Sequence, residues 1–262
     1  MKRGSTVRPG RPLTVALAAA AVAIGGCGGG QSQGAADQAS AAANGLPQGA
    51  EQVKVDPSQF TTKIDNPYLS FSPGDRWVYR GSSDDGPDQR IVVTVTDRTK
   101  TVANGVKGVV VHDVATVKGR TIENTYDWYA QDAQGNVWYE GEDTKAYDGS
   151  GKPDTAGSFE AGVDGAEAGV AMPGSPTQGQ TYRQEYYPGQ ARDGAEVLGT
   201  AQKADAPAGH YEDVVITGET TPLEPKIEEL KFYARGVGNV RAISVSGESD
   251  REDLTSFRPG GG

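Results

Sequence analysis

Side chains that could act as nucleophiles or metal ligands are few in this sequence, and their surroundings do not favour chemistry. The Gly-x-Ser-x-Gly pattern occurs at residues 30–34, with Ser32 as its serine. No strand is expected before it and no helix after it, so the strained turn that exposes such a serine cannot form. The histidines His112 and His210 lie far apart, and neither has a second His or Cys at metal-ligand spacing. We therefore predict no catalytic residue, no metal site and no cofactor.

Carboxylates are plentiful, and two groups of them fall in expected turns or loops. These groups are Glu140, Glu142 and Asp143, and Asp84, Asp85 and Asp88. Neither group has the ordered spacing of a calcium loop, so an acidic loop in contact with solvent is the favoured interpretation. A pair of acids like that of a glycosidase stays open as an alternative, because such acids meet in space and not in sequence.

Aromatic residues are the most distinctive candidates for ligand contact. Two groups flank an expected reversal at 132–135 and should face each other across a hairpin, and a third group follows at 182–187. Packing within the sheet is one explanation for these rings, and the lining of a binding cleft is the other. The candidates for ligand-facing positions are Tyr126, Trp128, Trp138, Tyr139, Tyr182 and Tyr186.

These candidates must be positioned by strands, because β-branched and aromatic residues alternate with polar residues along most of the chain. Strands are expected at 76–80, 90–97, 106–117, 120–131, 136–141, 181–187, 195–203, 211–221, 226–234 and 240–246. An irregular excursion is expected at 148–180, which is rich in Gly, Ala, Pro and Asp. The predicted fold is all-β, a single curved or partly closed antiparallel sheet preceded by a disordered linker. We expect Trp128 to be buried on the concave side of this sheet and to contribute more to stability than Trp138.

The N-terminal residues have the pattern of an export signal, in which a basic stretch precedes an apolar run. The run at 13–24 is shorter than the roughly 20 apolar residues that a membrane-spanning helix needs. It ends at Ile24-Gly25-Gly26-Cys27, which resembles the bacterial lipobox. The resemblance implies cleavage before Cys27 and attachment of a diacylglyceryl group and acyl chains such as palmitate to that residue. Cys27 is the only cysteine, so the chain has no disulfide framework.

Composition divides the chain into four parts. We expect a lipoprotein signal peptide at 1–26, a lipidated Cys27 with a flexible linker at 27–54, a single β domain at 55–258, and a disordered tail at 259–262. The signal peptide carries four cations and no acid, so its removal changes the formal charge from −10 to −14. Nucleic-acid binding needs a basic surface, and such an acidic chain is not expected to provide one.

Two stretches strengthen the comparison with exported proteins. The segments 124–139 and 231–238 resemble motifs of uncharacterised bacterial exported proteins and lipoproteins, and they imply a sheet rather than a reaction. More distantly, the C-terminal part is similar to curved-sheet periplasmic lipoprotein carriers, which hold acyl chains in a concave sheet. That similarity is at the level of the fold and transfers no functional residue.

Three hypotheses about function follow from the sequence. The leading one is a non-enzymatic binding or interaction module, anchored by diacylglyceryl-Cys27 to the outer face of the cytoplasmic membrane or elsewhere in the cell envelope. A lipid or other amphiphile is the first ligand class to test. The second is a cell-envelope hydrolase that uses carboxylates. The third is a structural envelope protein that binds a protein partner through a sheet edge.

Overall fold

The computed structural model describes residues 45–83, 86–223, 225–226, 228–246 and 249–261. Cys27, the signal peptide and most of the expected linker lie outside the described residues. The described part is built almost entirely of strands, with one short 3-10 helix, η1 (Pro57–Gln59), whose N-cap is Asp56. No helix in this part of the chain is long and apolar enough to cross a membrane.

The strands vary from long sheet-forming segments to two-residue pairings. They are β1 (Phe60–Thr61), β2 (Ile64–Asn66), β3 (Leu69–Phe71), β4 (Arg76–Ser82), β5 (Gln89–Thr101), β6 (Lys107–Val117), β7 (Arg120–Asp132), β8 (Val137–Tyr147), β9 (Pro153–Asp154), β10 (Phe159–Glu160), β11 (Glu167–Met172), β12 (Thr181–Arg183), β13 (Glu185–Tyr186), β14 (Gly194–Ala206), β15 (Gly209–Thr220), β16 (Glu228–Ala234), β17 (Gly238–Ser246) and β18 (Arg251–Arg258).

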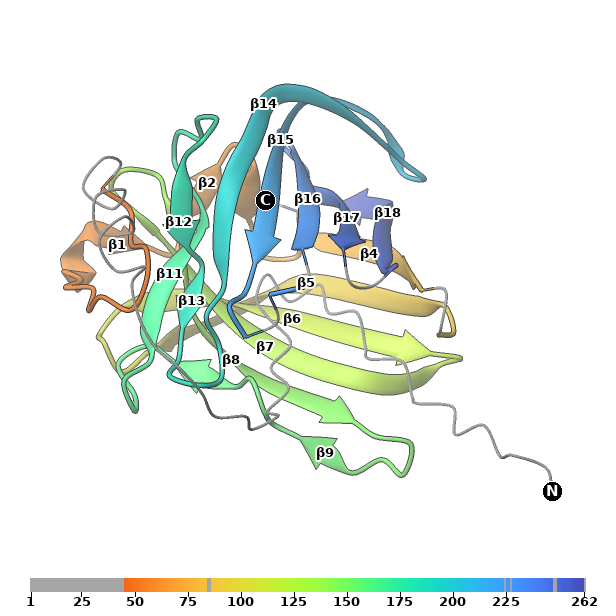
Figure 1. Ribbon diagram of the computed structural model, residues 1–262, viewed down its shortest axis with the longest axis horizontal. Helices are drawn as coiled ribbons and strands as arrows, with labels where there is room; N and C mark the ends of the chain where they lie inside the picture. The colour runs from red at the N-terminus through yellow and green to blue at the C-terminus, as the bar shows by residue number, and fades with distance from the viewer. Residues whose placement is uncertain (1–44, 84–85, 224, 227, 247–248, 262) are drawn as a thin grey trace.

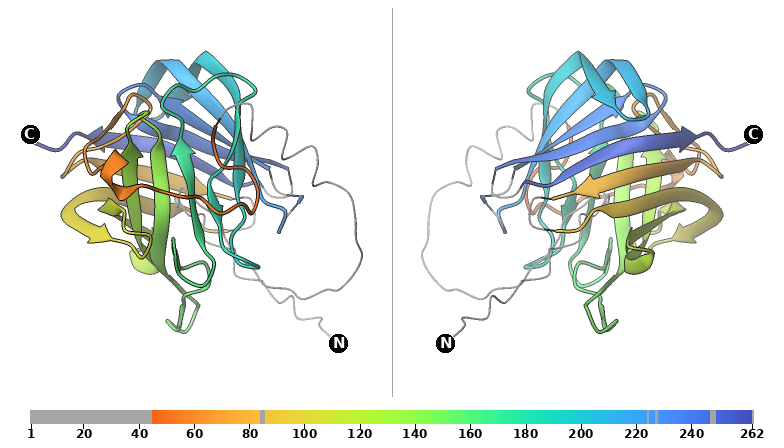
Figure 2. Two further views of the ribbon diagram at one scale, coloured as in Figure 1. Left: turned by 90° about the vertical axis from the view of Figure 1, so that its left-hand side faces the viewer. Right: turned by 90° about the vertical axis from the view of Figure 1, so that its right-hand side faces the viewer.

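All strands except β2 and β3 belong to one antiparallel sheet of 16 strands. Its main path runs β12-β14-β15-β16-β17-β18-β4-β5-β6-β7-β8-β11-β13. The two ends of this path, β12 and β13, are separated in the chain by the single residue Gln184. The sheet therefore curves until its ends nearly meet, and Figures 1 and 2 show it wrapping around a common interior. The predicted fold class is confirmed.

Local sequence explains both the strands and the reversals between them. In β5 the side chains of Ile91, Val93 and Val95 are buried while their neighbours are more exposed, the period of two that a half-buried strand requires. The predicted reversal between β6 and β7 is a two-residue turn, in which Lys118 has φ 51° and Gly119 has φ 79°. Consecutive positive φ values suit the right-handed twist of a hairpin, and glycine adopts them without steric cost.

The hydrophobic core is split between the two faces of the sheet. The main cluster includes Tyr129, Tyr139 and Tyr233 and fills the interior. A smaller cluster lies on the opposite face of the β6–β7 hairpin, and its buried members are Val102, Val106, Val110, Trp128 and Ala130. Trp128 is buried as predicted, but the prediction that it faces the concave side was wrong. Its strand position pairs it with Val110, away from Asp127 and Tyr129.

Three segments are more ordered than their composition indicated. Residues 45–54, assigned above to the linker, contact the sheet: Leu46 is buried, and the Val53 amide donates to Glu167 at 3.1 Å. Within 148–180, expected to be irregular, β11 joins the main sheet. In the expected tail, the amide of Gly260 donates to Asp75 Oδ1 at 2.7 Å. Composition missed these segments because their order comes from contacts with residues distant in sequence.

Candidate functional site

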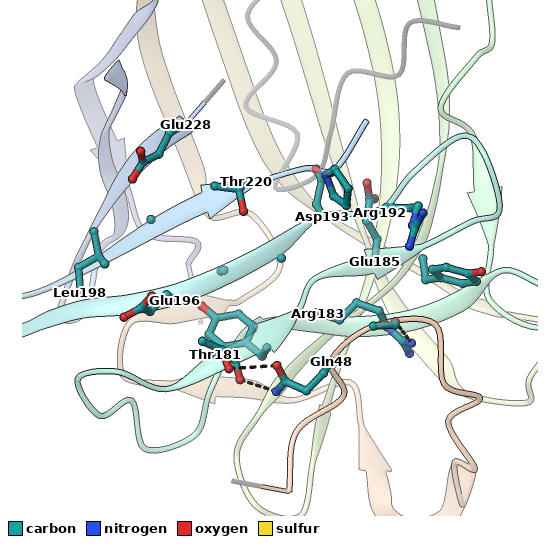
Figure 3. Close-up of a pocket in the computed structure, with 17 residues that line it drawn as sticks. Gln48, Thr181, Arg183, Glu185, Arg192, Asp193, Glu196, Leu198, Thr220 and Glu228 are labelled. Carbon is teal, nitrogen blue, oxygen red and sulfur yellow. Dashed lines mark hydrogen bonds between the residues drawn. The ribbon is translucent and has the colours of Figure 1, made fainter. Parts of the chain in front are cut away.

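A pocket lies where the two ends of the sheet meet, and we call it the seam pocket (Figure 3). Its volume is about 420 Å³. The strands β12 and β13 form its centre, the first residues of β14 and the last residues of β15 form one wall, and the segment Gln48–Gly49 forms another. Gly169 permits this closure, because a Cβ there would lie 2.3 Å from the backbone of Gln184. The pocket is therefore a consequence of how the sheet closes.

Arg183 fixes the N-terminal wall of the seam pocket. Its side chain is buried, and Nη1 donates to the carbonyl oxygens of Gly49 and Glu51 at 2.8 Å each, while Nη2 donates to the carbonyl of Ala168 at 2.8 Å. The Arg183 amide also donates to the carbonyl of Pro47 at 2.6 Å. Nε of Arg183 has no partner among the described residues. The guanidinium and the backbone amide of Arg183 together tie the segment 47–51 to β11 and β12.

A second arginine lies at the mouth of the pocket. Arg192 is exposed, and its guanidinium carbon is 5.9 Å from the ring centroid of Tyr186. The guanidinium carbon of Arg183 is 5.8 Å from the same centroid. The exposed carboxylates Glu196 and Glu228 also line the pocket, as Figure 3 shows. The seam pocket thus offers both charge signs around an aromatic ring.

Glu185 and Tyr182 belong both to the seam pocket and to the interior of the sheet. Each is buried, and Glu185 Oε1 and the Tyr182 hydroxyl have no hydrogen-bond partner in the part of the chain that the structure describes. Burial, then Asp193 and Glu142, raises the pKa of Glu185 well above its usual range. Burial, then Glu219, raises the pKa of Tyr182. Both shifts favour the protonated forms, and in those forms the groups can donate as well as accept hydrogen bonds.

The interior of the sheet is unusually acidic. The buried carboxyl side chains there are Asp113, Glu123, Asp127, Glu142, Glu185, Glu219 and Glu252. Among the described residues, Lys231 and Arg183 are the basic side chains that are buried. Lys231 is occupied by Glu219, with Nζ 2.6 Å from Oε2. Burial and mutual repulsion raise the pKa of Asp113, Glu142 and Glu252 well above the usual range.

Tyr139 joins two of these carboxyls. Its hydroxyl lies 2.9 Å from Asp127 Oδ1 and 3.0 Å from Glu142 Oε2. A phenol has one proton to donate, so both contacts are hydrogen bonds only when one carboxyl is itself protonated and donates to the phenol oxygen. Burial raises the pKa of Asp127 to about 7, against a weaker lowering by Tyr139. The geometry and the pKa directions therefore agree that this triad holds a carboxyl proton at neutral pH.

The six aromatic candidates lie in five different surroundings. Tyr182 and Tyr186 line the seam pocket, while Tyr139 lies in the interior triad. Tyr126 stacks on His112 on the outer face, with ring centroids 4.4 Å apart. Trp128 lies under Lys100, whose Nζ is 3.4 Å from the ring centroid. Trp138 donates from Nε1 to Asp132 at 2.8 Å. The structure therefore brings together only Tyr182 and Tyr186 in the seam pocket.

Sequence analysis missed most polar residues of these sites, and its interpretation of Glu140 and Glu142 as part of a solvent-exposed acidic loop was wrong, because both are buried in β8. Asp113 lies two residues after Val111 on one strand, and Asp127 lies two residues before Tyr129 on the next, so each shares an inward face with a buried neighbour. The alternation of faces along a strand could therefore have indicated both residues. Arg183 gave no such signal, because its partners are backbone carbonyls of distant segments. In the described ranges, no group of three or more His, Cys, Asp and Glu side chains has an arrangement that could hold a metal ion.

Comparison with known proteins gives little further information. No protein-family model matches the chain, and no curated protein matches it. A crystal structure of a candidate lipoprotein from Parabacteroides distasonis is similar at a TM-score of 0.42 and 13% sequence identity, covering 74% of this chain and 99% of that chain. A likeness this weak assigns neither a fold nor a function to this chain.

Proposed function

We propose that this protein is a non-enzymatic binding module that takes a small polar ligand in the seam pocket, at the outer face of a membrane. The observation that carries the proposal is the seam pocket itself. Its volume of about 420 Å³ falls in the range of pockets for small ligands, roughly 300 to 1,000 Å³. Its lining combines an aromatic ring with arginine, carboxyl and amide groups, a mixture that orients polar ligands.

Hydroxyl-bearing compounds are the ligand class that this lining favours. Arg192 offers N–H donors and Glu196 offers acceptors, while the side chain of Gln48 already bonds to Leu46 and Thr181. A hydroxyl group can donate and accept, so a ligand with several hydroxyls can meet such mixed partners without burying an unpaired charge. A lipid or other amphiphile, the first class indicated by the sequence, would need an apolar channel. The interior cavity beside Asp113 and Asp127 has a volume of about 30 Å³, too small for an acyl chain.

The membrane part of the proposal depends on Cys27. Two or more acyl chains hold a protein stably on a membrane, at ~0.8 kcal/mol for each buried methylene. We expect Cys27→Ser to move the protein from the membrane fraction to the soluble fraction without loss of its β-sheet signal, because the strands of the sheet supply a hydrophobic core of their own. Cell fractionation and circular dichroism measure the two outcomes. A variant that stays in the membrane fraction would contradict lipid anchoring.

Ligand binding is tested by saturation-transfer NMR on the full chain with a panel of monosaccharides, amino acids and short-chain phospholipids. Thr220→Trp places a large ring in the seam pocket, which Thr220 lines, and should abolish saturation transfer to any bound compound. Thr121→Trp is the matched control, because Thr121 is also an exposed threonine of a strand but lies outside the pocket.

The outcomes separate the possible ligand classes. Signals from monosaccharides that disappear in Thr220→Trp and persist in Thr121→Trp support the proposal. Signals from phospholipids alone would instead favour the amphiphile. If both variants lose binding equally, or if no compound of the panel binds, the seam pocket is not the ligand site.

A second candidate function, hydrolysis, is favoured by Glu185. A buried carboxylic acid that keeps its proton, with Asp193 close enough to raise its pKa, resembles the acid and carboxylate pair of glycosidases. Aryl glycosides and cell-wall polymers are the substrates to test. Hydrolysis that is lost in Glu185→Gln, with the unfolding midpoint preserved, would replace the binding proposal with an enzymatic one.

A further inference from the structure

A separate cavity lies inside the sheet, between β4, β5, β6, β7 and β17 and beneath β3. Four aromatic side chains and two carboxyl side chains are among its lining residues. These are Phe71, Trp77, Tyr79 and Tyr129, with Asp113 and Asp127. The rings are mutually packed: Phe71 lies 6.0 Å from Trp77 and 4.9 Å from Tyr129, centroid to centroid. We call this space the aromatic-acid cavity.

Asp113 is the unexplained group of this cavity. Its side chain is 3% exposed, and Oδ2 has no hydrogen-bond partner among the described residues. Asp127 differs, because its Oδ1 accepts from Tyr139 at 2.9 Å. The titratable groups that act on Asp113 are carboxyls: Asp127 and Glu123 from β7 and Glu252 from β18. A buried acceptor surrounded by acids lacks a positively charged donor.

We propose that the aromatic-acid cavity binds a small primary ammonium group, which donates a hydrogen bond to Asp113 and lies against the surrounding aromatic rings. This site is independent of the seam pocket. Aromatic faces attract cations, and Trp and Tyr do so most strongly. A hard metal ion would instead need six to eight oxygen ligands, and the described residues contain no cluster of three metal-binding side chains.

Size and donor count narrow the class of ligand. The cavity measures about 30 Å³, room for about two groups of the size of water. Ammonium and methylammonium fit this volume, and both carry N–H donors for Oδ2 of Asp113. A quaternary ammonium is larger and has no N–H group, so it satisfies neither requirement. The positive charge would also offset the repulsion between Asp113 and its neighbouring acids.

The test is a calorimetric titration of the purified full chain with ammonium chloride and methylammonium chloride. Butylammonium chloride, which carries the same headgroup on a longer chain, distinguishes a free ammonium ion from the end of a larger amine. Potassium chloride and tetramethylammonium chloride at equal ionic strength are the controls. We expect saturable binding of ammonium and methylammonium, which fit the cavity, and none of the control salts. Saturable binding of butylammonium as well would mean that the cavity takes the end of a larger amine. A response to potassium or tetramethylammonium as strong as that to methylammonium would overturn the proposal, as would no saturable binding.

Two variants locate the site. Asp113→Asn keeps the shape of the side chain and removes its charge, and it should weaken methylammonium binding by about tenfold or more. Glu140→Gln is the matched control, because Glu140 is equally buried and has an unpartnered Oε1, but does not line the cavity. Equal affinity in Asp113→Asn and the natural protein would refute the assignment.

The pH dependence gives a readout that does not rely on a variant. Burial and the carboxyls Asp127, Glu123 and Glu252 raise the pKa of Asp113, which favours its protonated form in the empty protein. Binding of a cation favours the ionised carboxyl and must release that proton, so methylammonium affinity should rise with pH, by about tenfold per unit for one released proton. If Asp113→Asn fails to fold, a flat pH profile in the natural protein still overturns the proposal.

Discussion

Two regions of this molecule bury groups that can carry charge, and they compensate for that burial differently. Around Arg183 the charge is retained, because three backbone carbonyls accept hydrogen bonds from its guanidinium. In the acidic interior, oxygen atoms of Asp113 and Glu252 have no partner among the described residues, and their raised pKa values indicate neutral carboxyls. Arginine cannot give up its proton in this way, whereas a carboxylate can become neutral by accepting one. Burial of Arg183 therefore requires hydrogen bonds to its guanidinium, whereas burial of the interior carboxyls requires only that they take up protons.

The largest expected effect comes from breaking the first region. Arg183→Met leaves the buried carbonyl of Ala168 unsatisfied, at about 1 to 3 kcal/mol, and also removes the donors to the part-buried carbonyls of Gly49 and Glu51. We expect a loss of roughly 3 kcal/mol or more in the free energy of unfolding, measured by urea denaturation. Arg192→Met should change it by less than about 0.5 kcal/mol, because Arg192 is exposed. Equal losses in the two variants would show that the carbonyl contacts do not stabilise the pocket wall.

The second prediction concerns the pH dependence of the acidic interior. Asp127 has its pKa raised from 3.8 to about 7, so the folded protein holds a proton that the unfolded chain releases as pH rises above about 4. The contribution of Asp127 to the free energy of unfolding is fully present below about pH 4 and is lost as pH rises through about 7. Each unit of such a shift corresponds to about 1.4 kcal/mol. The free energy of unfolding should therefore fall between pH 5 and pH 8.

Urea denaturation across that pH range measures the effect, and Asp127→Asn should make the profile less steep, because its amide does not titrate while Glu142 and the other interior carboxyls still do. Loss of stability toward acid instead, over pH 5 to 8, would mean that the interior carboxyls are ionised and paired. That outcome would remove the difference between the two regions.

A smaller change in unfolding free energy is expected when a hydrogen-bonded tyrosine hydroxyl of the interior is removed than when Arg183 is replaced. Tyr139→Phe removes the hydroxyl that contacts Asp127 and Glu142, and we expect a cost of about 1 to 2 kcal/mol in unfolding free energy. Tyr233→Phe is the matched control, because Tyr233 is equally buried but its hydroxyl has no partner among the described residues. That variant should be neutral or slightly stabilising. Thermal unfolding at pH 6 compares them, and an equal cost would place an unseen partner at Tyr233.

Strand periodicity was a good guide to the sheet and a poor guide to the sites. The alternation in 90–97 and the Lys118-Gly119 reversal were readable because both are local properties of the backbone. The same alternation places Trp128 and Asp127 on opposite faces, but it does not say which face is the interior. The prediction that Trp128 faces the concave side was wrong for that reason. Large aromatic rings suggest a core, yet here a second cluster on the outer face holds Trp128 and the interior holds the carboxyls.

The sequence by itself determined the all-β class, the main reversals and the expectation of a lipid-anchored export at Cys27. These depend on patterns only a few residues long, so neighbouring side chains and backbone preferences are enough to specify them. The tertiary structure alone decided that the sheet closes at Gln184, that residues 47–51 form a pocket wall with Arg183, and that distant acids such as Asp113 and Glu252 interact. Those features arise from contacts between segments far apart in the chain, and a repulsion that raises a pKa exists only once the sheet has curved and brought the acids together.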